Sequence, residues 1–349
     1  MHSEVQPNSR SDCNRNTGTW SVLAAALLCL GPTGCHSYRA LPDAALAEAN
    51  GATLAQRDVE AIADDYLSAL LEYRPELGTM YSLPGARHDR LADNSPEARF
   101  AWQAREDAWL AELSASGIRA EVGSRDWVTY GILHETLASS AAIRVCRNEL
   151  WAASNMTAWH TLVPSLFDIQ PVDTPELQRQ ALQRLAALPK YIDIEIANLR
   201  RGLESGYSAP RLTVAPAVNE VRALAGADSP LLSPGVRAGD PQFAAEVQAL
   251  FETDIAPAVE RFARFLEAEY LPRAREDIGL GFNPDGAACY PALVRNYATI
   301  EPAASEIHRL GLQQVARIRA EMQAIIDEHF AGATIEAFLR GLNDDPQYT

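Results

Sequence analysis

Histidine and acidic side chains supply the first candidates for chemistry in this sequence. The chain has seven histidines, and only His134 is followed directly by a glutamate, Glu135. A helical zinc site requires two imidazoles on one helix face and a carboxylate that acts as a base. His134-Glu135 begins in this way, but Ala138 stands where the second imidazole is needed. We therefore predict that His134 is a structural or surface residue and that this chain holds no metal.

Other motifs that carry chemistry are missing from the sequence. It contains no G-x-S-x-G nucleophile turn, no phosphate-binding G-x-x-x-x-G-K-[ST] loop and no G-x-G-x-x-G after a strand. The remaining groupings of histidine with glutamate, Glu306 with His308 and Glu328 with His329, are common patterns of a helix surface. We therefore predict no catalytic residue and no cofactor in this chain.

Composition predicts a helical protein with an acidic surface. Of the 349 residues, 47% are hydrophobic and only 7% are aromatic, and alanine, leucine, glutamate and arginine dominate. These residue types favour helices. The formal net charge of -16 leaves no basic footprint for nucleic acid. We therefore exclude a nucleic-acid partner.

Helical periodicity recurs along most of the chain. Apolar residues follow one another at spacings of three and four, which predicts amphipathic helices packed on a common core. Helix-start signals precede two of these segments, at Ser95-Pro96 and at Thr174-Pro175. We expect an all-α fold, an irregular multi-helix bundle. The segments are 59–73, 96–113, 174–206, 257–274 and 304–325.

Three local features of the predicted helices can be tested by the structure. Pro189 should kink its helix or divide it in two. The Pro- and Gly-rich residues 229–241 should form a loop. The large apolar residues of segment 96–113 should lie in the core, and they are Phe100, Trp102, Trp109 and Leu110.

The N-terminus has the layout of an export signal. Arg10 and Arg15 precede an apolar run that is too short to span a bilayer, and small residues follow it. Cys35 comes directly after Gly34, as in a bacterial lipoprotein signal, although Pro32 departs from the usual aliphatic residue. We predict a signal peptide at 1–34, a flexible tether at 35–55 and a helical domain at 56–349.

Modification of Cys35 determines whether the exported protein is anchored to a membrane. If Cys35 is lipidated, the mature chain begins there and is anchored to a membrane, and His36 after it favours the outer membrane. The alternative is ordinary cleavage that releases a free periplasmic protein. We predict an exported, periplasmic protein that is lipid-anchored through Cys35.

Two of the five cysteines lie in the predicted helical domain. Cys146 and Cys289 can pair in an oxidising compartment, but the sequence gives no distance between them. Free cysteines are among the most buried residues in proteins. We therefore predict two buried, unpaired thiols.

The C-terminal part of the chain resembles the signature of the bacterial "domain of unknown function 885" family. That signature has a Gly-x-x-x-Tyr segment, a turn with threonine, an Ile-His-x-x-Gly element and a Val-x-x-Ile-x-x-x-Met helix. The blocks 73–97, 182–206 and 267–277 resemble the family as well, so the similarity runs from about residue 60 to the last residue. The residues that match the signature are Gly286, Tyr290, Thr299, Ile307, His308, Gly311, Val315, Ile318 and Met322.

The resemblance implies a two-lobed helical fold around a cleft, related to the gluzincin type of zinc metallopeptidase. It implies a zinc ion held by a His-Glu-x-x-Pro-Gly-His element, whose glutamate is the general base, and a later glutamate. No such element occurs in this sequence. Family members continue beyond the region that matches residues 338–349, and their zinc element lies in that further half. We therefore expect an N-terminal fragment that is inactive alone, with zinc and a peptide substrate only in a full-length form.

Three residues are candidates for contact with such a substrate. Tyr290, Arg295 and His308 can face the cleft in the fold that the resemblance implies. Alternatively, Tyr290 packs in the core, Arg295 pairs with a local acid and His308 pairs within its own helix. A different function also stays open, since the chain can be a stand-alone helical periplasmic binding lipoprotein without catalysis.

Overall fold

The computed structural model describes residues 58–115, 121–156, 158–330 and 332–347. Every regular element in these ranges is helical, and the one β-type pairing is an isolated bridge between Pro210 and Arg275. The predicted all-α fold is confirmed. The predicted signal peptide, Cys35 and the tether at 35–55 lie outside the described residues.

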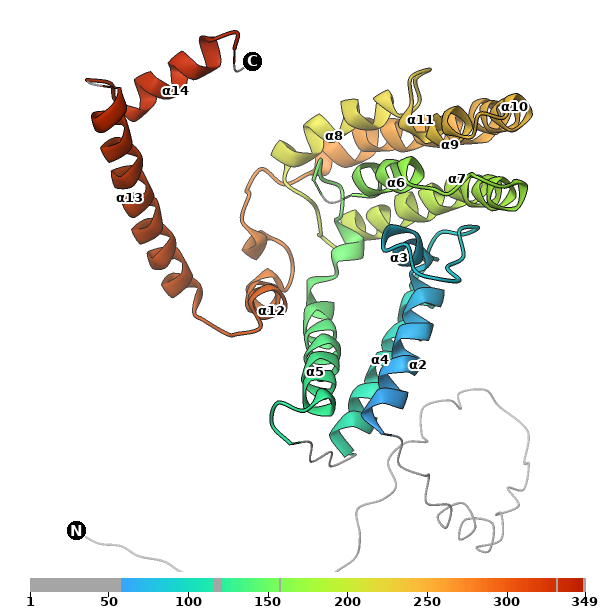
Figure 1. The fold of residues 1–349 in the computed structure, drawn as a ribbon, viewed down its shortest axis with the longest axis horizontal. Helices are drawn as coiled ribbons and strands as arrows, with labels where there is room; N and C mark the ends of the chain where they lie inside the picture. The colour runs from blue at the N-terminus through green and yellow to red at the C-terminus, as the bar shows by residue number, and fades with distance from the viewer. Residues whose placement is uncertain (1–57, 116–120, 157, 331, 348–349) are drawn as a thin grey trace, which may run out of the picture. The chain divides into compact units, whose positions relative to one another are not determined.

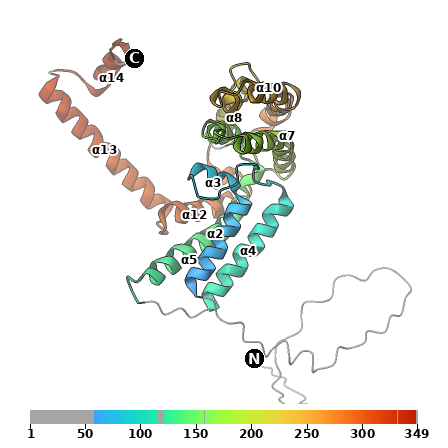
Figure 2. The same ribbon diagram turned by 45° about the vertical axis from the view of Figure 1, so that its right-hand side comes forward.

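Three helices, α2 (Val59–Tyr73), α4 (Pro96–Ala115) and α5 (Arg125–Ile143), pack side by side around one small core (Figure 2). Ser95 accepts a hydrogen bond from the backbone of Ala98 and so caps α4 as predicted. Trp102 and Trp109 are buried where the three helices meet.

Phe100 does not join this core. Its side chain is 63% exposed, whereas Trp102 and Trp109 are 8% and 4% exposed. The prediction of a core position is wrong for Phe100 because hydrophobic type alone does not place a residue on the buried face of a helix.

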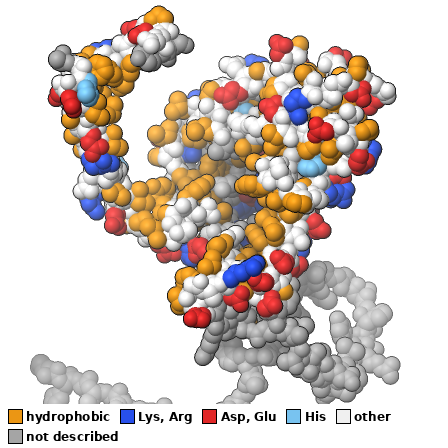
Figure 3. Space-filling view, viewed as in Figure 1, with side chains coloured by type: hydrophobic (Ala, Val, Ile, Leu, Met, Phe, Trp, Pro, Cys, Tyr) orange, Lys and Arg blue, Asp and Glu red, His pale blue; other side chains and the backbone are white. Residues whose placement is uncertain are grey.

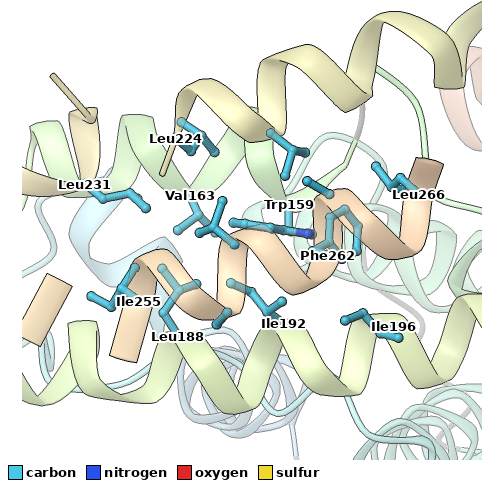
Figure 4. Close-up of a cluster of buried hydrophobic side chains, with 14 of the residues drawn as sticks. Trp159, Val163, Leu188, Ile192, Ile196, Leu224, Leu231, Ile255, Phe262 and Leu266 are labelled. Atoms are coloured by element: carbon cyan, nitrogen blue, oxygen red, sulfur yellow. The ribbon is translucent and has the colours of Figure 1, made fainter. Parts of the chain in front are cut away.

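A second, larger core lies among the helices from α6 (Trp159–Asp168) to α11 (Ala256–Phe265) (Figures 1 and 4). The rings of Trp159 and Phe262 meet edge to face at 5.3 Å near its centre. The face predicted for segment 257–274 is confirmed, and its buried residues are Val259, Phe262, Leu266 and Tyr270. The other helices here are α7 (Pro175–Glu204), α8 (Arg211–Ala223), α9 (Ser233–Arg237) and α10 (Pro241–Leu250).

Two of the local predictions need correction. α7 is one continuous helix of 30 residues that contains Pro189, so the alternative that this proline divides the helix is wrong. Packing of the buried face of α7 against its neighbours outweighs the one backbone hydrogen bond that proline removes. The segment 229–241 is not a plain loop, because it forms the 3-10 turn η3 (Pro230–Leu232) and the short helix α9. Pro230 is the first residue of η3 and Pro234 the second of α9, positions in the first turn that suit the fixed φ of proline.

A buried arginine attaches an early loop to α7. The Arg184 side chain is fully buried. Its guanidinium donates to the backbone carbonyl oxygens of Arg87 and Arg90 and to the side chains of Thr79 and Gln170, at 2.7–3.0 Å. Burial lowers the pKa of this guanidinium to about 10, so it stays charged at neutral pH. The network holds the loop after α3 (Pro75–Met80) against α7.

A disulfide joins the end of α5 to α12 (Gly286–Ala298). Cys146, in the 3-10 turn η1 (Arg144–Cys146), is bonded to Cys289, and their Cα atoms are 4.7 Å apart. The prediction of two unpaired thiols is therefore wrong. Folding brings η1 onto the first turn of α12, at a separation within the range of disulfides, which the sequence positions alone do not reveal.

Gly286, one of the residues of the family signature, is at a site with no room for a side chain. A Cβ atom there would lie 2.0 Å from the carbonyl oxygen of Leu280, which belongs to the 3-10 turn η7 (Leu280–Phe282). Gly202 has a similar place in α7, since its Cβ would lie 1.7 Å from the carbonyl oxygen of Leu150. Both glycines allow close approach of two backbones.

The last two helices are α13 (Ala304–His329) and α14 (Ile335–Asp344). They contact each other, with the rings of Phe330 and Phe338 4.6 Å apart and an ion pair between Arg319 and Glu336. Within the part of the chain that the structure describes, Ile326 is the only one of the 26 residues of α13 that is buried. α13 therefore presents most of its surface uncovered.

Candidate functional site

The predicted cleft residues lie on α12 and α13. Tyr290 and Arg295 both belong to α12, and His308 belongs to α13. Tyr290 is 43% exposed, and His308 is exposed near the start of its helix. Five residues along a helix separate Tyr290 from Arg295, which turns them by about 140° around the axis at 3.6 residues per turn. The two side chains therefore lie on different faces of α12.

Arg295 forms a clamp between helices. Its guanidinium donates two hydrogen bonds of 3.0 Å to the carboxylate of Glu135 on α5, and a third of 3.0 Å to Glu301. The hydrogen bonds and charge of Arg295 hold the pKa of Glu135 below its ordinary value. The paired arginine stabilises the contact of α12 with α5, which agrees with the alternative that Arg295 pairs with an acid.

The contacts of His134 and Glu135 show whether this pair could hold a zinc ion. Both carboxylate oxygens of Glu135 accept hydrogen bonds from Arg295, and the ring of His134 stacks on Tyr130 at a centroid distance of 5.6 Å. Ala138 lies one helical turn further along α5 and offers no ligand. These residues do not fit a zinc site. Across the described ranges, no group of three or more His, Cys, Asp or Glu side chains is arranged to hold a metal ion.

An apolar stripe runs along α13. Its predicted members keep the spacing of three and four, but the helix buries almost none of them. Val315 and Ile325 are each 56% exposed. Figure 3 shows hydrophobic side chains along this helix. The exposed members of the stripe and its flanks are Leu310, Leu312, Val315, Ile318 and Ile325.

Such a stripe is unusual on a water-facing helix. Soluble proteins rarely expose contiguous apolar patches without using them to bind something. Full burial of one such side chain contributes about 1.5–3 kcal/mol. The α13 stripe is therefore a candidate interaction surface, and with Tyr290 and His308 nearby in sequence it forms the candidate functional site.

His160 is a buried ionisable group elsewhere, in the larger core. Both of its ring nitrogens, and Nε1 of Trp159, are buried and form no hydrogen bond in the described structure. Glu220 is the nearest acid, with an oxygen 3.6 Å from Nε2, which is too long for a hydrogen bond. Burial lowers the pKa of His160 to about 4. The imidazole is therefore neutral in the folded protein at neutral pH.

This burial predicts a loss of stability in mild acid. The ordinary histidine pKa of 6.5 applies to the unfolded chain, so the unfolded state binds more protons between about pH 6.5 and pH 4. The contribution of His160 is complete above pH 6.5 and falls as the pH falls, by about 2 kcal/mol at pH 5. Urea unfolding of His160→Gln should show a weaker dependence on pH than the unchanged chain. His329→Gln, an exposed control, should leave it unaltered, and equal slopes for His160→Gln and the unchanged chain would contradict the prediction.

Known proteins match most of the helical part of the chain. The family described as "Bacterial protein of unknown function (DUF885)" matches residues 75–349. A solved structure, titled as the "putative lipoprotein" from Colwellia psychrerythraea, superposes with a TM-score of 0.70 at 17% sequence identity. The match covers 83% of this chain and 54% of that chain, so this chain spans about half the length of the solved protein. At this identity the likeness shows a shared fold. No match was found among curated proteins.

Proposed function

We propose that this chain, which belongs to the DUF885 family of bacterial proteins, forms the N-terminal part of an exported protein related to zinc metallopeptidases. In this proposal it supplies the scaffold and one wall of a cleft, and it is inactive alone. Its own residues offer no zinc site at His134-Glu135, so no catalytic step is assigned to them.

The uncovered face of α13 is the observation that carries the proposal. α13 has 26 residues and an apolar stripe, but only one of its residues is buried. Contact of the stripe with water is unfavourable, and covering it would stabilise the helix. About half of the solved Colwellia protein has no counterpart here, and in this proposal a further part of the protein covers the stripe. A contact between two lobes at α13 would place the cleft beside α12 and α13.

In this proposal the exposed residues of α12 and α13 contact the substrate. Tyr290 and His308 have accessible side chains. Arg295 is held by Glu135 and Glu301, so its part would be to fix α12 rather than to bind a peptide directly. The substrate class that the family relation suggests is a peptide.

Export is supported by the disulfide. Disulfides persist in oxidising compartments such as the bacterial periplasm and are rare in the cytosol. Cys146–Cys289 therefore agrees with the signal peptide proposed at residues 1–34. We propose attachment to the outer membrane through a lipid on Cys35. Within the described residues no helix combines the length and apolar character needed to cross a membrane.

The coding sequence that follows Thr349 and the protection of α13 together test the proposal. We expect a continuation, in the same or another frame, that encodes a His-Glu-x-x-Pro-Gly-His element. When that longer product is made, backbone amides of residues 304–329 should exchange with solvent more slowly than in the present chain. A stop followed by an unrelated gene, or equal exchange in the two products, would contradict the proposal.

A stand-alone binding protein is the second candidate function. The observation that favours it is a polar hollow lined by arginines between α4 and the end of α5. A binding protein would keep a ligand site without any continuation of the chain, whereas the N-terminal lobe of a peptidase would not need one there.

A further inference from the structure

Two adjoining hollows lie between α4, the end of α5 and the turns that follow it. The larger has a volume of about 410 Å³ and the smaller about 170 Å³. They share Arg99, Phe100, Arg147 and Glu149 in their walls, so they form one groove. Together they fall within the usual range of small-ligand sites. We call this the arginine groove.

Positive charge is in excess at the centre of the groove. Arg99 and Arg147 both pair with the same oxygen of Glu149, at 3.0 and 3.2 Å. One carboxylate therefore serves two guanidiniums, and one positive charge is left over. Arg201, at the far end of the groove, hydrogen-bonds to the uncharged side chain of Asn198. Glu106 and Glu204 also line the hollows, so the two linings together hold four arginines and three glutamates, an excess of one positive charge in a chain of net charge -16.

Arg144 adds a hydrogen-bond donor that has no acceptor. Its terminal nitrogens pair with the buried carboxylate of Glu106 at 3.0 Å and with Asp107 at 2.7 Å. Its Nε is buried and donates no hydrogen bond to any described residue. Such a donor carries a free-energy penalty in the chain without a ligand.

One wall of the groove is aromatic. The rings of Tyr73 and Trp102 stack at a centroid distance of 4.7 Å and are nearly parallel, and both line the larger hollow. Phe100 lines both hollows and is mostly exposed. An exposed phenyl ring at the mouth of a charged groove offers a planar apolar surface to a ligand.

The backbone at Arg147 is held in an uncommon conformation. Arg147 has φ 46° and ψ 43°, the left-handed region, at the junction of η1 and the 3-10 turn η2 (Asn148–Leu150). The disulfide at Cys146 fixes η1 immediately before it. Backbone strain of this kind is found preferentially at ligand sites, because the surrounding structure must hold it in place. Arg144 and Arg147 both line the larger hollow.

We propose that the arginine groove binds a small organic anion in which a carboxylate is attached to a planar apolar group. The carboxylate accepts hydrogen bonds from Arg99 and Arg147, and the planar group lies against Phe100. This site is independent of the proposed N-terminal lobe, since none of its residues belongs to α12 or α13, and it is the hollow that favours the second candidate function. Its failure would leave the proposed N-terminal lobe untouched.

Calorimetric titration of the purified chain with benzoate, and with benzamide as an uncharged analogue of the same shape, tests the site. Hydrogen bonds to charged groups contribute about 1.5–3 kcal/mol, so benzoate should bind roughly tenfold or more tightly than benzamide. Added salt should weaken benzoate binding because the groove is partly exposed. Inorganic phosphate, which lacks the planar group, should bind more weakly than benzoate.

Variants locate the site. Arg147→Gln should weaken benzoate binding by about tenfold or more. Arg179→Gln, which removes the same charge from an exposed position of α7, should change it by less than about twofold. If Arg147→Gln does not fold, as judged by its thermal melting, Arg99→Gln replaces it, because Arg99 has ordinary helical geometry in α4. The proposal is overturned if benzoate shows no saturable binding, if benzamide or phosphate binds as well, or if Arg147→Gln or Arg99→Gln binds like Arg179→Gln.

Discussion

Replacing Cys146 and Cys289 together by serine is expected to lower the free energy of unfolding by about 2–5 kcal/mol. The disulfide closes a loop of 143 residues in sequence, and such cross-links restrict the unfolded chain most when the loop is long. It also attaches α12 to η1, and the ion pair of Arg295 with Glu135 joins α12 to α5. Urea unfolding of the variant and of the oxidised chain gives the difference.

Reduction supplies the control for this prediction. A reducing agent should destabilise the unchanged chain to about the level of the double variant and should leave the variant as it is. Arg295 and Glu135 are present in the reduced chain and in the variant, so their ion pair attaches α12 to α5 equally in the two proteins. If the unchanged chain under oxidising conditions is no more stable than the variant, and mass analysis finds Cys146 and Cys289 as free thiols in it, the disulfide does not form.

Replacing Arg184 by alanine is expected to cost about 2–5 kcal/mol of stability. The substitution empties the space of a large, fully buried side chain and leaves its four acceptors without their donor. Arg184→Lys keeps a charge but cannot supply the planar fork that reaches these acceptors, so it should also destabilise. The midpoint of urea unfolding measures both effects.

A neighbour on the same helix provides the matched control for Arg184. Arg179 is one turn away on α7, is exposed, and pairs with Glu176. Arg179→Ala should change stability by no more than about 0.5 kcal/mol. Similar effects of Arg184→Ala and Arg179→Ala would mean that the buried network does not hold the loop after α3.

Local sequence signals predicted the elements where burial follows periodicity. The stripe of α11 is buried as expected, and that of α2 is buried at Val59 and Ile62 and partly buried at Ala63, Tyr66 and Leu70. The spacing of three and four matches one helix face, and each face has a neighbour to pack on. Thr174 and Ser95 start their helices because each side chain accepts a hydrogen bond from the first turn. These features depend on a few adjacent residues only.

Features that depend on distant residues could not be predicted in this way. The pairing of Cys146 with Cys289 and the hydrogen bonds of Arg184 require knowledge of which turns meet in space. Glu135 looked like part of a zinc motif, but its partner is an arginine 160 positions away. The arginine groove was missed for the same reason, although Arg144 and Arg147 on either side of Cys146 are a local cluster of charge.

The α13 stripe shows the limit of periodicity most clearly. Its spacing predicted the helix correctly, yet the pattern gave no information on whether anything within this chain covers it. Amphipathic character indicates that a face is suited to burial and leaves the partner unspecified. That is why the uncovered face supports the proposal of a second lobe.

Metal analysis of the purified chain, combined with its activity on a mixture of peptides, tests the central claim most directly. A catalytic zinc requires about three protein ligands and one open position for water. Because Glu135 is held by Arg295 and no second imidazole lies one turn from His134, we predict no stoichiometric zinc and no peptide cleavage by this chain alone. One tightly bound zinc per chain, lost in His134→Ala or His308→Ala together with peptide cleavage, would contradict the account.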